Sequence, residues 1–123
     1  MSFVKKETRR VRHILTEPRY GIRALPEGLT GLLRFPPEVL AELGWKDKDQ
    51  IEVLVGTDED TGWLALRKSG TFIPGNAKIH IEENGVGDFC SRHIVPEGCE
   101  IRVSMKAVDC RIDDGVFTFR PVF

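Results

Sequence analysis

A chain of 123 residues in which 41% of the side chains are hydrophobic and 30% are charged suits one compact domain or two very small ones. It can build a core without disulfides or a structural metal. No apolar run approaches the ~20 residues that span a bilayer, and the N-terminal sequence MSFVKKETRRVRH is too polar for a signal peptide. We therefore expect a cytoplasmic protein without membrane contact. The cysteines Cys90, Cys99 and Cys110 are odd in number and unpatterned in spacing, which predicts reduced thiols with a structural role.

The net charge of −1 conceals an uneven distribution. Residues 1–31 carry a net charge of +4, and residues 32–123 carry −5. A separation of this kind is typical of a cationic contact surface on an acidic body. It predicts an anionic partner without identifying it.

Residues 1–30 are predicted to form a basic arm followed by a connector. In the arm, the spacing of Val4, Val11 and Ile14 is weakly helical, whereas residues 10–14 alternate as a strand does, and both interpretations stay open. The arm either contacts phosphates, whose neutralisation releases counterions, or is a solvated tail or edge strand. The connector, residues 18–29, contains a short extended piece at 20–25 and is punctuated by Pro18, Gly21, Pro26 and Gly28.

Residues 31–68 show the most regular pattern, which predicts a strand, a short helix and a hairpin. The helix begins near Pro36, because a proline suits the first helical turn, where an N–H would lack a partner. Gly44 stands where a left-handed residue ends a helix, and Trp45 is expected to fold back as the hydrophobic contact of that cap. Strands follow at 51–55 and 62–67, on either side of an acidic loop. The helix is amphipathic, with its apolar face formed by Val39, Leu40 and Leu43.

The order of these elements resembles the looped-hinge, swapped-hairpin domain of the AbrB, SpoVT and MazE family. The resemblance covers residues 31–68 and rests on Phe35-Pro36, Leu43-Gly44, the turn with Asp49 and the strand Ile51-Glu52-Val53. It implies two copies that interleave their hairpins as a homodimer and bind double-stranded DNA. Members that bind DNA carry Lys or Arg around the short helix, whereas the helix here carries Glu38 and Glu42 and no basic residue.

Residues 69–123 are predicted to form a second β unit packed on the first. Strands are expected at 77–81, 89–95, 100–105, 108–112 and 116–122. The sequence Leu25-Pro26-Glu27-Gly28-Leu29 is echoed by Val95-Pro96-Glu97-Gly98-Cys99, although Pro-Glu-Gly is also a common turn. The fold class is therefore mainly β with one short helix. The resemblance implies an AbrB-like swapped-hairpin barrel, and the echo adds the alternative of a pseudo-symmetric barrel formed within one chain.

Catalytic and metal sites are poorly supported by the sequence. Cys90, His93, Cys99 and Cys110 could supply zinc ligands, yet no C-x-x-C pair is present and strand periodicity already accounts for Cys99 and Cys110. The acidic runs at 58–60 and 113–114 fall in predicted turns, where aspartate is favoured. No nucleophile elbow, phosphate loop or H-E-x-x-H motif occurs. We predict no metal, no cofactor and no enzymatic activity.

The leading hypothesis is a double-stranded DNA-binding protein, a transcription regulator that acts as a homodimer. The alternative is an antitoxin-like or phage-type inhibitor, which docks its acidic surface, centred on residues 58–60, on a basic protein partner. A monomer in which residues 77–123 take the place of the second copy also stays open. The residues predicted to contact DNA are Arg9, Arg10, Arg12, Arg19, Arg23 and Arg34.

Arg34 receives the most specific prediction. Strand alternation turns it away from the core that Leu33 and Phe35 enter. It is therefore expected to contact phosphate or base, or else to form a cross-strand ion pair.

Overall fold

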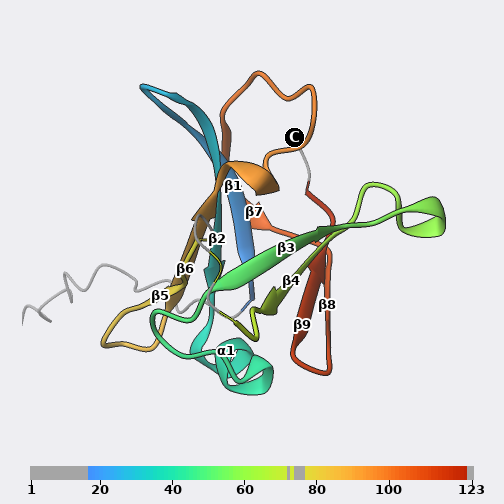
Figure 1. Cartoon of the computed structure of the whole chain (residues 1–123). Coiled ribbons are helices and arrows are strands. Elements are labelled where there is room, and N and C mark those ends of the chain that lie inside the picture. The colour runs from blue at the N-terminus through green and yellow to red at the C-terminus, as the bar shows by residue number, and fades with distance from the viewer. Residues whose placement is uncertain (1–16, 72, 74–76, 122–123) are drawn as a thin grey trace, which may run out of the picture.

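The computed structural model describes residues 17–71, 73 and 77–121 (Figure 1). The fold is mainly β with one short helix, as predicted. The single helix is α1 (Pro37–Leu43), and two short 3-10 turns are η1 (Asp58–Asp60) and η2 (Arg92–Ile94). The strands are β1 (Arg19–Leu25), β2 (Gly28–Phe35), β3 (Ile51–Val55), β4 (Leu64–Lys68), β5 (His80–Ile81), β6 (Gly87–Ser91), β7 (Val103–Ala107), β8 (Cys110–Asp113) and β9 (Val116–Phe119).

The strands form two antiparallel sheets that face each other. Sheet A has the order β5-β6-β2-β1-β7, and sheet B has the order β3-β4-β9-β8. Among the described residues, no strand ladder joins β5 to β3 or β7 to β8, which are the edge strands of the two sheets, so the sheets do not close into a barrel. The prediction of a closed barrel is wrong, because in the described chain β7 and β8 form no ladder, and on the other side segment 77–81 makes only the single bridge between Lys78 and Gln50 toward sheet B.

The core fills the space between the two sheets. Strand alternation sends Leu33 and Phe35 inward from sheet A and Leu66 and Phe117 inward from sheet B, and all four are fully buried. The rings of Phe35 and Phe117 meet edge to face with their centroids 4.9 Å apart. Such a contact adds about 0.5–1.5 kcal/mol to the burial of the two rings.

Helix α1 closes one end of this core, and its ends are formed as predicted. Pro37 occupies the first turn, and Leu40 and Leu43 are buried. Gly44 has φ 74°, a left-handed conformation that costs a residue without Cβ little. The ring of Trp45 packs edge to face against Phe35, with 5.5 Å between centroids. The cap therefore joins the helix to sheet A.

Several strand predictions in the second β unit require correction. The strand expected at 89–95 ends at Ser91, because the Ser91 hydroxyl accepts a hydrogen bond from the backbone N–H of His93 and begins η2. The strand expected at 77–81 forms a ladder only at His80–Ile81. The strands expected at 100–105, 108–112 and 116–122 occupy 103–107, 110–113 and 116–119.

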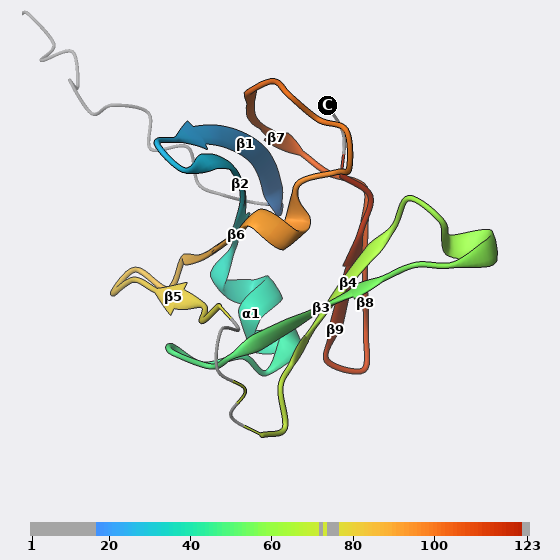
Figure 2. The same ribbon diagram turned by 45° about the horizontal axis from the view of Figure 1, so that its top comes forward.

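Two strands of residues 31–68 each receive one partner from the second β unit, on the side that β1 or β3 leaves free. β2 pairs with β6, and β4 pairs with β9. Figures 1 and 2 also show that the turn between β3 and β4 projects away from the body.

In the described part of the chain, no helix has the length and apolar character needed to cross a membrane.

Candidate nucleic-acid interface

Three of the six arginines predicted to contact DNA lie on the outward face of sheet A. Arg19 is directly opposite Arg34 in the β1–β2 register, so both side chains leave the same face. Arg23 follows Arg19 by four positions and shares that face, because alternate residues of a strand point the same way. Arg23 and Arg34 are exposed and Arg19 is half-buried. We call this surface, Arg19, Arg23 and Arg34, the arginine face.

Arg34 also forms the cross-strand ion pair that was the alternative to anion contact. Its Nε donates to Oδ1 of Asp88 at 2.9 Å, and the two residues are opposite each other on β2 and β6. This hydrogen bond raises the pKa of Arg34 above its ordinary value, and the charge of Glu82 acts in the same direction. The terminal nitrogens of Arg34 make no hydrogen bond with any described residue. The pair therefore holds the guanidinium in place while its outer edge can still donate to an anion.

A hollow of about 330 Å³ lies beside these arginines, between β2, β1 and β7. Arg23 and Arg34 line it together with apolar residues, among them Leu32 and Met105. Leu32 is only 5% exposed although it belongs to the outward face, and it lies outside the main core cluster. A side chain at Gly21 would crowd this surface, since a Cβ there would lie 2.9 Å from the backbone carbonyl oxygen of Val103 and 2.6 Å from Sδ of Met105. The hollow thus offers two guanidinium groups at the side of an apolar surface, which suits the phosphate and sugar of a nucleic-acid backbone.

Cys90 completes this surface, although the sequence indicated only a structural thiol or a zinc ligand at this position. It is opposite Leu32 on β6, and its side chain is exposed. Partial burial raises the pKa of its thiol, the charge of Asp88 adds to that rise, and Arg23 and Arg34 oppose it. Cys90 is opposite Leu32, which precedes Arg34 by two positions on β2, so the thiol leaves the same face of sheet A as Arg34. Asp88, Cys90 and Met105 belong to strands 50 to 80 residues away in sequence, so no local pattern could place them beside Arg34.

The other predicted contacts lie outside the described residues. Arg9, Arg10 and Arg12 belong to residues 1–16, which the structure does not describe. The first described residue, Glu17, precedes Arg19 by two positions. The arm is therefore covalently attached at the start of the strand that carries Arg19 and Arg23.

The candidate zinc ligands are not assembled in the described part of the chain. Within residues 17–71, 73 and 77–121, no three His, Cys, Asp or Glu side chains are grouped to hold a metal ion. Cys90, Cys99 and Cys110 are free thiols. The acidic run 58–60 forms the exposed turn η1 at the end of the β3–β4 hairpin. Trp63 is covered by the guanidinium of Arg111, 4.7 Å from the ring centroid.

Comparison of the chain with protein-family models, with curated protein sequences and with solved structures gives no match.

Proposed function

We propose that this protein binds double-stranded DNA through the arginine face of sheet A. The observation that carries the proposal is the placement of Arg19, Arg23 and Arg34 on one outward face beside an apolar hollow. The Cα atoms of Arg19 and Arg23 are four strand positions apart, about 13 Å at the usual rise per residue. A small anion would meet one of these groups, whereas an extended polyanion can meet all of them. The negative charges of Asp88 and Glu82 both raise the pKa of Arg34, so these two acids are the ones that would oppose an approaching anion at this arginine.

The contacts proposed for this face are mainly to phosphates. Arginine and lysine contacts to phosphate supply affinity without sequence preference, and guanidinium contacts to guanine edges add discrimination. Arg34, held by Asp88, is oriented and therefore suited to a specific contact. Arg9, Arg10 and Arg12 would extend the cationic surface from the start of β1. Helix α1 has no place in this contact, because Glu38 and Glu42 are exposed on it.

As part of the same proposal, we infer that the protein is related to AbrB-like transcription regulators. The order β2, α1, β3, β4 supports it, since this is the strand, helix and hairpin order of that family. We propose that one chain supplies both halves of the arrangement, with β6 and β9 standing where strands of a second copy would pair. The protein would then regulate transcription as a DNA-binding unit with a single arginine face.

Matched substitutions on the two sheets test the DNA proposal. Fluorescence anisotropy of a labelled duplex of ~20 base pairs, titrated at several salt concentrations from ~50 mM, gives affinity and its salt dependence. Arg23→Gln should weaken binding to every duplex and lower the slope of log K against log salt by about 1. Arg67→Gln is the control, because Arg67 pairs with Glu52 on sheet B, away from the arginine face. Equal losses from both substitutions would remove the arginine face from the proposal.

The alternative of a protein-binding module is favoured by a different observation. The β3–β4 hairpin carries the exposed acids Asp58, Glu59 and Asp60 at its turn. This turn projects from the body (Figure 2). It follows β3, whose outer edge has no ladder partner among the described residues.

A further inference from the structure

β3 and β6 border a gap between the two sheets, and among the described residues one short segment bridges it. Lys78 pairs with Gln50 just before β3, and His80 pairs with Asp88 on β6, both in the antiparallel sense. The segment 77–81 is thus a half-length strand antiparallel to both neighbours. Beyond it, Val53–Val55 and Phe89–Ser91 have no strand partner across the gap among the described residues.

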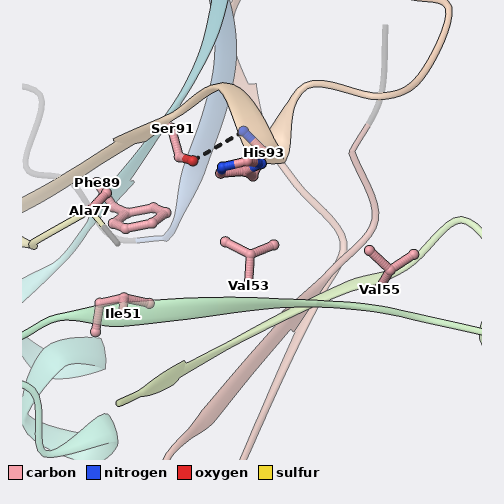
Figure 3. Close-up of a pocket in the computed structure, with 7 residues that line it drawn as sticks. All are labelled: Ile51, Val53, Val55, Ala77, Phe89, Ser91 and His93. Carbon is pink, nitrogen blue, oxygen red and sulfur yellow. Dashed lines mark hydrogen bonds between the residues drawn. The ribbon is translucent and has the colours of Figure 1, made fainter. Parts of the chain in front are cut away.

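A pocket of about 260 Å³ occupies the open half of this gap. Figure 3 shows Ile51, Val53 and Val55 along β3 on one side, with Phe89 and His93 facing them from the other. Val55 is 72% exposed, more than any other large hydrophobic side chain in the described chain. The opening is therefore apolar along β3, with an imidazole on the opposite wall.

The backbone of β3 is oriented to receive a strand. The N–H of Ile51 donates to the carbonyl of Ala77 across the gap, at 3.0 Å. Since successive residues of a strand direct their backbone groups to opposite sides, the N–H and C=O groups of Val53 and Val55 also point into the gap and away from β4. An edge of this kind is a ready template for another strand.

We propose that an extended segment of a basic partner protein inserts into this gap as a strand, antiparallel to β3 and in line with residues 77–81. Its alternate apolar side chains would enter the pocket beside Val53 and Phe89. The antiparallel direction fixes its polarity, because its N-terminal part must run past Val55 toward the turn at 58–60. Asp58 and Glu59 form no ion pair within the described chain, and Asp60 is 4.0 Å from Arg111. Charge complementarity therefore requires Lys or Arg at the N-terminal end of the segment.

A pair of synthetic peptides tests both the site and the polarity. The first probe is the fluorescein-labelled peptide Lys-Arg-Lys-Thr-Val-Thr-Val-Thr, and the second has the same composition with the three basic residues at the C-terminal end. The first should bind at least about fivefold more tightly, because only it places its charges beside the hairpin turn. Asp58→Asn with Glu59→Gln should abolish this preference. Equal affinity for the two peptides, or no binding of either at ~1 mM, would overturn the proposal.

Substitution of Val55 tests insertion as a strand. Val55→Pro removes an N–H that faces the gap and is not used in the ladder with β4, so an edge strand can accept it. It should weaken the first peptide about tenfold, whereas Val55→Thr, which keeps the N–H and the branched side chain, should leave affinity within about twofold. Circular dichroism and melting of the variant establish that it is folded. Methylation of the peptide's backbone nitrogens should abolish binding without any change in the protein, and retained binding would contradict strand insertion.

The same variant and the same labelled peptide distinguish a partner protein from two other possible occupants of the gap. The first alternative is a second copy of the chain. Light scattering would then show a mass that doubles as the concentration rises and that stays at one chain in Val55→Pro, and this result would overturn the partner proposal. A peptide of residues 2–16 of this chain that displaces the first probe would assign the gap to the chain's own N-terminal segment, with the same consequence. The partner proposal expects a constant mass and no such displacement.

Discussion

At the scale of single residues, the arginine face depends on the balance between Arg34 and Asp88. The side chain of Arg34 is 45% exposed and that of Asp88 is 19% exposed, so the pair is partly solvated and contributes no more than about 1 kcal/mol to stability. The carboxylate also competes with any phosphate that approaches Arg34. In the proposed DNA contact, Asp88 would therefore orient the arginine at the expense of some affinity.

Substitution of either member of the pair should separate these roles. Arg34→Ala should cost about 1–3 kcal/mol in duplex affinity and change the melting temperature little, because no core atom is lost. Asp88→Asn should strengthen non-specific duplex binding, since it removes a negative charge from the face. Anisotropy titrations and thermal melts of both variants provide the measurements. If Arg34→Ala lowers the melting temperature and leaves duplex affinity unchanged, Arg34 is structural.

Tyr20 offers a second prediction at this scale, because it is the only tyrosine in the chain. Its buried hydroxyl donates to the carbonyl of Ile94, and burial, with a smaller contribution from Cys99, raises its pKa well above the ordinary value of 10.0. The folded state therefore favours the protonated form, and this stabilisation is complete below pH 10 and is lost as the pH rises further. Near-ultraviolet absorbance should show tyrosinate only as the protein unfolds in alkali. Ionisation near pH 10 with circular dichroism unchanged would contradict this burial.

At the scale of elements, local signals predicted the helix and the hairpins but not the arrangement of the sheets. Pro37 and Gly44 act through their own backbone preferences, so the ends of α1 were correctly predicted. The extended piece at 20–25 proved to be β1, yet its place between β2 and β7 depends on pairings distant in sequence. The outward direction of Arg34 followed from alternation. The strand register that places Arg19 opposite Arg34 did not follow from alternation.

Gly31 shows how one strand position fits a distant turn. A Cβ at this position would collide with the side chain of Ile94 in η2, which packs against β2. Gly31→Ala should therefore destabilise the fold by about 1–3 kcal/mol. Gly70→Ala is the matched control, because a Cβ there meets nothing within 4 Å, and it should be neutral or stabilise slightly. Urea unfolding gives both values, and equal stability of the two variants would contradict the packing of η2 on β2.

At the scale of the whole molecule, the second β unit supplies, in each of the two sheets, one strand that pairs with a strand of residues 31–68. β6 covers β2, and β9 covers β4, which leaves the outer edge of β3 as the edge next to the pocket. The homodimer that the family resemblance implies stays a prediction. The pairing within one chain favours the monomer.

Light scattering at micromolar concentration measures the assembly state directly. We expect a mass near 13.9 kDa, because the core strands β2 and β4 are already paired on both sides. The variant Arg67→Gln, which changes the surface of sheet B, is the control and should have the same mass. A mass of two chains that persists on dilution would restore the swapped homodimer.

The salt dependence of duplex binding by the unmodified protein tests the central claim most directly. Neutralisation of one phosphate contributes about 0.9 to the slope of log K against log salt. The three arginines of the described face would give a slope of about 2.7, and all six predicted arginines would give about 5.4. We therefore expect binding at ~50 mM salt with a slope between these values. No detectable binding to any duplex at that salt, or an affinity that salt does not change, would contradict DNA recognition by this protein.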